Sequence, residues 1–137
     1  MPQLKFELRH PNAKLPTKAN PTDAGLDAIA VDRKVQLEYV EYDLGFGVEV
    51  PEGYMLLIFP RSSISKYDLL QCNSVGIIDV GYVGNVKVRY ETIEDLATIY
   101  QVGDKICQLV LVPLVDTEVI QVDKIGGDRS GFGSTGV

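Results

Sequence analysis

The feature that most limits the fold of this 137-residue chain is a series of short β-type runs with no sustained helical period among them. The runs are bounded by Gly, Pro, Asp or Asn, and in order they are QLKFEL, VQLEYVE, GFGVEV, YMLLIF, NVKVRYE and KICQLVLV. A single short helix is expected between Ser62 and Tyr67. Many short strands in succession are typical of a sandwich or barrel, so the sequence predicts a compact all-β jelly-roll domain over residues 1–125.

The composition of the chain argues against a membrane protein and against a nucleic-acid-binding protein. The longest apolar runs, such as that from Leu109 to Val115, are far shorter than the roughly 20 residues that a spanning helix needs. The net charge of -6 opposes broad binding to nucleic acid, which requires basic patches. The start MPQLKFELRHPNAKLP lacks the apolar segment of a secretory signal, so we expect a cytoplasmic protein with a small-molecule partner.

The cysteine and histidine content argues against a zinc site or a disulfide framework. The chain has two cysteines, Cys72 and Cys107, and one histidine, His10, without zinc-ligand spacing. We expect both cysteines to be small core residues and His10 to lie in a solvated loop. Any chemistry must therefore come from carboxylates, hydroxyls, amides and the backbone.

The glycine-rich C-terminus, from Gly126 to Val137, is the one clear shift in composition. Its last residues, GFGSTGV, contain the pattern G-x-G-x-x-G of a dinucleotide-binding turn. That turn works between a strand and a helix whose N-terminus faces a pyrophosphate, but only Val137 follows the last glycine. The dinucleotide interpretation therefore fails, and a disordered tail remains one interpretation of this segment.

Two groups of polar residues stand out among apolar neighbours. Gln108 interrupts the run DKICQLVLVPLV, in which both faces of a strand should be buried, and a buried amide needs hydrogen-bond partners. A structural hydrogen bond and a ligand contact are both compatible with this position. Arg61, Ser62 and Ser63 follow a proline and are suited to binding a phosphate at the start of a short helix. Pairing of Arg61 with an acid and capping of the helix by a serine are the alternatives.

A third group lies in NSVGIIDVGYVGNVKV, which predicts a β-hairpin with Asp79 and Tyr82 at its mouth. An aspartate directly after two isoleucines is unusual for a plain strand, and turn capping by Asp79 is the alternative. In PTDAGLDAIA, Asp27 lies between apolar neighbours in another short strand. The two carboxylates are therefore candidates for the chemistry of the protein.

In chain order, PTDAGLDAIA, PRSSIS, NSVGIIDVGYVGNVKV, GDKICQLV and GFGSTG resemble the five sequence motifs of the homotrimeric deoxyuridine triphosphatase (dUTPase) family. These motifs run from Pro21 to Gly136, and the connecting DLGFGVEVPEGY is also similar. The resemblance implies a distorted β jelly roll, a homotrimer, and hydrolysis of dUTP to dUMP and pyrophosphate with Mg²⁺. Mg²⁺ is expected to bind through the triphosphate oxygens and to keep several waters, without a dedicated protein cage.

The resemblance also implies roles for individual residues. Asp79 matches the catalytic aspartate that activates the attacking water. An ionised carboxylate suits this role because it can accept a proton. Tyr82 matches the aromatic residue that packs on the deoxyribose, Asn73 matches the amide that contacts uracil, and Asp27 matches an aspartate near the water shell of the metal. The other substrate-binding positions in the core are Arg61, Ser62, Ser63, Gly76, Ile78, Lys87 and Gln108.

The C-terminal segment, residues 126–137, corresponds to a mobile arm that in the family closes over the active site of a neighbouring subunit. Phe132 matches the aromatic residue over the base, and the positions near the phosphates are Arg129, Gly133, Ser134 and Thr135. Family tails usually place an arginine five residues before the phenylalanine, whereas Arg129 lies three before it. Gly81 is a second departure, because many members carry an acid there.

Two further interpretations compete with this one. A dCTP deaminase, alone or bifunctional with dUTPase activity, belongs to the same structural superfamily and also uses an Arg-Ser-Ser element. Deamination needs a glutamate beside the amino group of the base, and GIIDVGY offers Asp79 instead. A nucleotide-gated regulatory protein would retain the nucleotide pocket and control a protein partner through the arm.

Overall fold

The computed structural model describes residues 1–133, and these residues form short antiparallel strands with one 3₁₀ helix. The strands are β1 (Lys5–Leu8), β2 (Leu26–Ile29), β3 (Asp32–Val35), β4 (Tyr39–Asp43), β5 (Phe46–Glu49), β6 (Tyr54–Phe59), β7 (Leu69–Gln71), β8 (Gly76–Ile78), β9 (Lys87–Thr92) and β10 (Lys105–Pro113). The 3₁₀ helix η1 (Ser62–Lys66) lies where a short helix was predicted. The all-β prediction is confirmed, but the predicted run VQLEYVE contains a turn, since β3 ends at Val35 and β4 begins at Tyr39.

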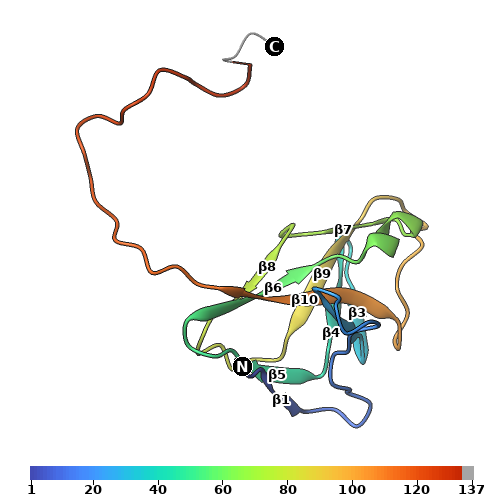
Figure 1. The fold of residues 1–137 in the computed structure, drawn as a ribbon. Helices are drawn as coiled ribbons and strands as arrows, with labels where there is room; N and C mark the ends of the chain where they lie inside the picture. The colour runs from blue at the N-terminus through green and yellow to red at the C-terminus, as the bar shows by residue number, and fades with distance from the viewer. Residues whose placement is uncertain (134–137) are drawn as a thin grey trace.

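The strands form three sheets, which Figure 1 shows as a compact β body with a long C-terminal extension. One four-stranded sheet has the order β2-β10-β6-β8 and is called the site sheet below. The other has the order β3-β4-β9-β7 and is called the back sheet. β1 and β5 form a separate two-stranded sheet. Every strand pair is antiparallel, as expected for a jelly roll.

The core is built from the alternate residues of both four-stranded sheets. Leu56 and Leu109 of the site sheet and Val40 of the back sheet are fully buried. Tyr42 and Tyr90 lie in the same cluster, where the Tyr42 hydroxyl donates to the carbonyl of Tyr100 over 2.8 Å. Burial raises the pKa of Tyr42 to about 12, so the tyrosine stays neutral and packs as an apolar residue with one satisfied donor.

The outward face of the site sheet is apolar but lacks a covering layer among the described residues. Alternation along β6, β8 and β10 turns one set of side chains away from the core, namely Met55, Leu57, Phe59, Ile77, Gln108, Val110 and Val112. Of these, Ile77 is 62% exposed, and the others are half-buried. The prediction that both faces of β10 are buried therefore does not hold within the single chain.

The predicted hairpin from Gly76 to Val88 is not a hairpin, because its two strands belong to different sheets. β8 pairs with β6 in the site sheet, whereas β9 pairs with β4 and β7 in the back sheet. Val86 is bonded to the start of β5 and to the turn before it, since its N–H donates to the carbonyl of Phe46 and its carbonyl accepts from the N–H of Leu44. Residues 79–86 thus cross from one sheet to the other, with Gly81 at a φ of +92°.

The two cysteines also differ from the prediction that both are core residues. Cys107 is buried, but Cys72 is exposed because it follows β7 at the start of a turn. Burial raises the pKa of the Cys107 thiol to about 12, and the nearby Asp27 carboxylate adds to this effect. His10 is half-buried in an irregular segment, where its Nδ1 accepts a hydrogen bond from the N–H of Asn12.

The C-terminal segment leaves the β body at the end of β10. The N–H of Leu114 still donates to Gly53, but residues 115–133 form no strand or helix and are exposed throughout. Figure 1 shows this segment running away from the sheets. The exposed segment therefore begins before the composition change at Gly126. Among the described residues, no helix has the length and apolar character to cross a membrane.

Candidate active site

A small cavity of about 240 Å³ opens beside β8 and is called the edge cavity below. Its lining consists of Ile58, Asn73, Gly76, Ile77, Ile78, Asp79, Tyr82, Val86 and Lys87. The structure therefore brings together six of the residues predicted for the site: Asn73, Gly76, Ile78, Asp79, Tyr82 and Lys87. The crossing of residues 79–86 between the two sheets creates this space, which a closed hairpin would not provide.

One wall of the edge cavity is the free edge of β8. Within the described chain β8 has a single neighbouring strand, β6, so its other backbone edge retains unpaired polar groups. Gly76 lies close against Ile58, because a Cβ added at Gly76 would come within 3.1 Å of that side chain. A flat ligand at this edge would meet backbone donors and acceptors on one side and the aliphatic Ile58 beside them.

Asp79 follows β8 directly and is exposed at the cavity. None of the residues from 1 to 133 donates a hydrogen bond to its carboxylate; only its backbone carbonyl accepts one, from the N–H of Tyr82 at 3.2 Å. Turn capping by the Asp79 side chain is therefore not what the structure contains. Both carboxylate oxygens are available to a ligand or a water molecule.

Tyr82 lies across the crossing segment rather than projecting into solvent. Its hydroxyl donates to the carbonyl of Asn85 over 2.9 Å, and the residue remains 47% exposed. Gly84 permits this position, since a Cβ there would come within 2.7 Å of the Tyr82 hydroxyl oxygen and 2.9 Å of Cζ. The ring is held at both ends and presents a fixed apolar surface beside Asp79.

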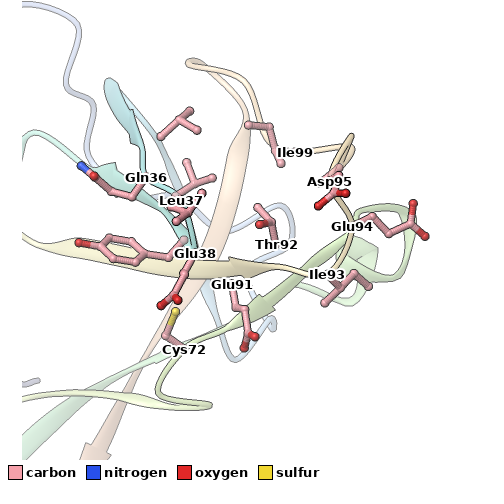
Figure 2. Close-up of a pocket in the computed structure, with 14 residues that line it drawn as sticks. Gln36, Leu37, Glu38, Cys72, Glu91, Thr92, Ile93, Glu94, Asp95 and Ile99 are labelled. Carbon is pink, nitrogen blue, oxygen red and sulfur yellow. The ribbon is translucent and has the colours of Figure 1, made fainter.

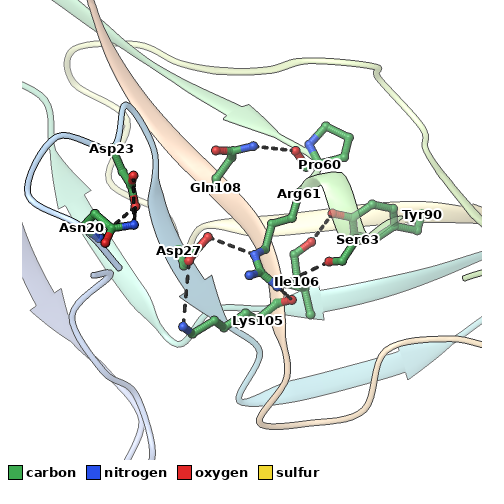
Figure 3. A network of polar contacts seen from close by, with 10 residues as sticks. All are labelled: Asn20, Asp23, Asp27, Pro60, Arg61, Ser63, Tyr90, Lys105, Ile106 and Gln108. Carbon is green, nitrogen blue, oxygen red and sulfur yellow. Dashed lines mark hydrogen bonds and ion pairs between the residues drawn. The ribbon is translucent and has the colours of Figure 1, made fainter. Parts of the chain in front are cut away.

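A second polar group, called the ion-pair cluster below, lies around the end of β6 (Figure 3). Arg61 Nε donates to Asp27 Oδ1 over 2.9 Å, and Lys105 Nζ lies 3.9 Å from Asp27 Oδ2. The Arg61 Nη1 donates to the carbonyl of Lys105 at 3.3 Å and approaches Ser63 Oγ at 3.5 Å. Two cations face one carboxylate, so the cluster carries a surplus positive charge that suits a phosphate.

Gln108 and the serines are placed beside this cluster. Gln108 Nε2 donates to the carbonyl of Pro60 over 2.9 Å. The structural hydrogen bond that was one of the two predictions for this amide is therefore present. A Cβ at Gly25 would collide with Gln108 Oε1, so the glycine leaves room for the amide. Arg61 occupies the capping position of η1 without a side-chain capping bond, and Ser62 is exposed. Capping of η1 by a serine is thus not observed.

The carboxylates of the edge cavity and the ion-pair cluster are not adjacent in one chain. Asp27 on β2 and Asp79 after β8 are separated by β10 and β6. Three strand spacings amount to about 14 Å across the sheet. Asp27 is aligned with Phe59 of β6, whereas Ile78 is aligned with Leu56, three residues away, and Asp79 lies one residue further. The register thus adds a shift of four residues along the strands, about 13 Å.

The predicted arm residues lie away from both groups. Arg129, Phe132 and Gly133 belong to the exposed C-terminal segment, and the side chain of Phe132 is fully exposed. Ser134 and Thr135 lie outside the described residues.

A larger hollow of about 800 Å³ lies on the back sheet, between the turn after β3 and the segment after β9 (Figure 2). Its charged lining residues are all acidic, namely Glu38, Glu91, Glu94 and Asp95. Coulomb repulsion opposes binding of a triphosphate there. The smaller edge cavity is therefore the better candidate for a nucleotide.

Sequence reasoning missed two residues that the structure places in these groups. Lys105 joins the ion-pair cluster because β10 aligns its first residues with the end of β2. Gln71, the one polar residue that is buried among residues 1–133, donates to Asn73 behind the edge cavity. Alternation along LLQ would have placed Gln71 on the same face as the core residue Leu69 and marked it as unusual.

The fold and its two polar groups define a jelly-roll protein suited to a ligand with a flat polar ring and an anionic tail. Comparison with protein families makes this specific: the dUTPase family model matches residues 11–137. The chain belongs to the dUTPase family.

Relatives and solved structures agree with this assignment. The deoxyuridine 5'-triphosphate nucleotidohydrolase of Hydrogenobaculum sp. is 36% identical over 133 residues, covering 92% of each chain. The SPbeta prophage-derived deoxyuridine 5'-triphosphate nucleotidohydrolase YosS of Bacillus subtilis is 39% identical over 103 residues, covering 72% of each. The dUTPase of Staphylococcus bacteriophage 80alpha, solved with dUPNHPP, has a TM-score of 0.80 and 27% identity, covering 98% of this chain and 99% of that one. These findings confirm the distorted jelly roll and favour neither the deaminase nor the regulatory interpretation.

Proposed function

We propose that this protein hydrolyses dUTP to dUMP and pyrophosphate, which limits uracil in DNA and supplies dUMP for dTMP synthesis. The observation that carries the proposal is the edge cavity, in which Asp79 lies beside a free strand edge. None of the described residues donates a hydrogen bond to the Asp79 carboxylate. No glutamate lines the cavity, so the acid that a deaminase would need is not among its described residues. Because free deoxynucleotides are the substrates, we infer a cytoplasmic location.

The proposed reaction is attack of water on the α-phosphorus. Asp79 orients a water molecule and accepts its proton as the new oxygen–phosphorus bond forms. The bond between the α-phosphorus and the bridging oxygen breaks, and pyrophosphate leaves with that oxygen. Because no donor among residues 1–133 competes for the Asp79 carboxylate, both of its oxygens can accept hydrogen bonds from this water.

The base and sugar are selected within the edge cavity. We infer that uracil binds along the free edge of β8 at Gly76 and Ile78, with Asn73 and Lys87 at the rim. Cytosine reverses the donor and acceptor pattern at N3 and C4, which would leave buried polar groups unpaired. The Tyr82 ring packs on the deoxyribose at C2′, where a ribose hydroxyl has no room.

The triphosphate is assigned to the ion-pair cluster. Arg61 offers a guanidinium fork, and Ser62, Ser63 and Gln108 add polar groups around it. Lys105 supplies further positive charge near the same point. Pairing with Asp27 keeps the guanidinium in one orientation before the substrate arrives.

The residues of the site fit a Mg²⁺ ion that is held mainly by the substrate. Among the described residues, no group of three or more His, Cys, Asp or Glu side chains could hold a metal ion. Asp27 is a single carboxylate already paired with Arg61, so its proposed contact with Mg²⁺ is indirect, through water. The ion would neutralise charge on the phosphate oxygens during the reaction.

We infer a homotrimer in which neighbouring subunits complete each site. Asp27 of the ion-pair cluster and Asp79 of the edge cavity are separated in one chain by two strands and a register shift, which supports a site that different copies complete. The apolar outward face of the site sheet offers a surface for this association. Further apolar residues on the exposed segment after β10, including Val115, Val119 and Ile120, are available to a neighbour.

The C-terminal arm is proposed to close a neighbour's site. Phe132 would cover the base, while Arg129 and the backbone around Gly133, Ser134 and Thr135 would approach the phosphates. Arg129 lies two positions nearer to the phenylalanine than the family's arginine. It would therefore approach the triphosphate from a different position of the backbone. In this proposal the unit of residues 1–125 consists of the β body and the exposed segment that follows Pro113, and residues 126–137 form the arm.

The proposal is tested by incubating the purified protein with each deoxynucleoside triphosphate and Mg²⁺, and measuring pyrophosphate and ammonia. Pyrophosphate from dUTP alone is the expected result. Ammonia from dCTP would support a deaminase, and neither product would support a regulatory protein. Light scattering on the same sample should give the mass of a trimer, and a fully active monomer would contradict the shared site.

A further inference from the structure

Gln71, at the end of β7, is a polar residue inside the core. It is 9% exposed and shares the inner face of β7 with the buried Leu69. Gln71 Nε2 donates one hydrogen bond to the carbonyl of Ile58 and one to Asn73 Oδ1, each at 3.1 Å. Ile58 and Asn73 both line the edge cavity, so Gln71 lies directly behind it.

The hydrogen bonds fix the orientation of two amides in sequence. A backbone carbonyl can only accept, so the Gln71 atom that faces Ile58 must be its NH₂ nitrogen. The second hydrogen of that nitrogen points at Asn73, so the facing Asn73 atom must be its oxygen. The planar amide then places Asn73 Nδ2 away from Gln71, and among residues 1–133 no group accepts a hydrogen bond from it. Nδ2 is therefore the polar atom that Asn73 offers to a ligand in the cavity.

We propose that Gln71 is a positioning residue that sets the preference of the cavity for uracil over cytosine. By holding Asn73 Oδ1, it leaves the Asn73 amide hydrogens as donors to the base. The uracil O4 accepts such a bond, whereas cytosine presents a 4-amino donor that would oppose it. This inference rests on the proposed function, since it assumes that the base lies in the edge cavity.

The burial of Gln71 supports a role beyond packing. Its Oε1 has no hydrogen-bond partner among the described residues, which lowers the stability of the fold relative to an apolar residue of the same shape. A leucine or methionine would fill the same space without that cost. The amide is therefore explained by what its nitrogen does to Asn73.

The test uses Gln71→Met, which keeps the length of the side chain and removes the donor. The affinities of dUTP and dCTP are measured as KM and as the inhibition constant of dCTP against dUTP. We expect KM for dUTP to rise about tenfold, kcat to stay within about twofold, and the dUTP preference over dCTP to fall about tenfold. Asn73→Ala should lose the preference to a similar degree, and adding Gln71→Met to it should change little more.

The control is Val40→Ala, which removes buried volume from β4 away from the cavity. It should lower the melting temperature and leave the dUTP preference intact. If Gln71→Met also melts earlier but keeps the wild-type preference, Gln71 is only structural and the proposal is wrong. If wild-type protein shows no preference for dUTP, the proposed function itself fails, and this inference fails with it.

A second measurement needs no variant of Gln71. The side-chain NH₂ resonances of Asn73, assigned by their loss in Asn73→Ala, should shift when dUMP is added to the native protein. Unchanged resonances at saturating dUMP would overturn the assigned orientation.

Discussion

The edge cavity and the ion-pair cluster are two polar regions of the same sheet, but only one of them is internally paired. Asp79 has no hydrogen bond to its carboxylate from the described residues, whereas Asp27 is bonded to Arg61 and lies near Lys105. Asp27 also has a side chain that is 16% exposed, while Asp79 is an exposed residue. The Asp79 carboxylate is thus available to a ligand, whereas the Asp27 carboxylate holds the Arg61 guanidinium.

The difference follows from where each region lies in the sheet. The ion-pair cluster joins β2, β10 and the end of β6, so neighbouring strands supply partners for each charge. The edge cavity lies beyond the last strand of the sheet, where backbone and side-chain groups lack a neighbour. Asp27 lies on β2, which is also an edge strand, so its pairing comes from the cations that β10 and the segment after β6 place beside it, whereas no described residue supplies such a partner to Asp79.

The largest effect is expected from Asp79→Asn, which removes the proposed base from the edge cavity. The turnover of dUTP should fall by roughly 10²–10⁴-fold, because a positioned general base contributes that much. Binding of dUPNHPP should remain, since the amide keeps the shape of the side chain. Near-normal turnover in steady-state kinetics would show that the two aspartates have been assigned wrongly.

Removal of residues 128–137 tests whether either region works without the arm. Turnover should fall about 10²-fold, because the triphosphate is no longer held in line with the water. Phe132→Ala should cause part of that loss. The melting temperature should hardly change, because the described part of this segment is exposed.

Mixing subunits adds a direct test of the shared site. Truncated chains mixed with full-length Asp79→Asn chains should regain activity if subunits exchange, since each supplies the part that the other lacks. Full activity of the truncated protein alone would mean that GFGSTGV is only a disordered end.

Arg61→Ala separates the ion-pair cluster from the edge cavity. The KM for dUTP should rise about 10- to 100-fold, the range for a lost charged hydrogen bond. The affinity for deoxyuridine, which has no phosphate, should stay unchanged in a calorimetric titration. Arg61→Lys serves as the control that keeps the charge without the fork. An equal loss of affinity for deoxyuridine would show that the ion-pair cluster also binds the nucleoside, and it would contradict the assignment of separate roles to the two regions.

Tyr82→Ala tests the sugar contact within the edge cavity. The preference for dUTP over UTP should fall about tenfold, because the ring that excludes a 2′-hydroxyl is gone. Competition kinetics with UTP measure this ratio. Tyr82→Phe is the control, as it keeps the ring and loses only the bond to Asn85. Unchanged selectivity in the alanine variant would remove Tyr82 from the site.

The smallest effect is expected in the stability of the fold at high pH, through Cys107, which lies beside Asp27 of the ion-pair cluster. Burial and Asp27 raise the pKa of Cys107 from an ordinary 9.0 to about 12, so the fold favours the neutral thiol. This contribution is complete below pH 9 and is lost as the pH rises towards 12. The melting temperature should decline over that window, and less steeply in Cys107→Ala. Burial and the Glu91 carboxylate also raise the pKa of the exposed Cys72 thiol, so Cys72→Ser should remove a smaller part of the decline than Cys107→Ala.

The candidate site could be predicted from the sequence where the signal was local. Asp79, Tyr82 and Asn73 lie within one continuous motif, so their common location in the edge cavity needed only a short segment of chain. Lys105 could not be found in this way, because its partner Asp27 lies on another strand. Alternation along LLQ marks Gln71 as an unusual polar residue, but its hydrogen bond to Asn73 depends on the turn that follows β7. The two cysteines illustrate the same limit, since composition does not reveal that Cys72 begins an exposed turn.

The strand-rich character of the chain, the short helix after Arg61 and the motifs that identify the family could all be read from the sequence. These features depend on side-chain alternation and on turn residues, which act over a few neighbours. The placement of β8 and β9 in different sheets, with a cavity beside the segment that joins them, became visible in the three-dimensional structure. Strand pairing depends on hydrogen bonds and packing between residues far apart in the chain, and short β runs carry no local mark of their partner.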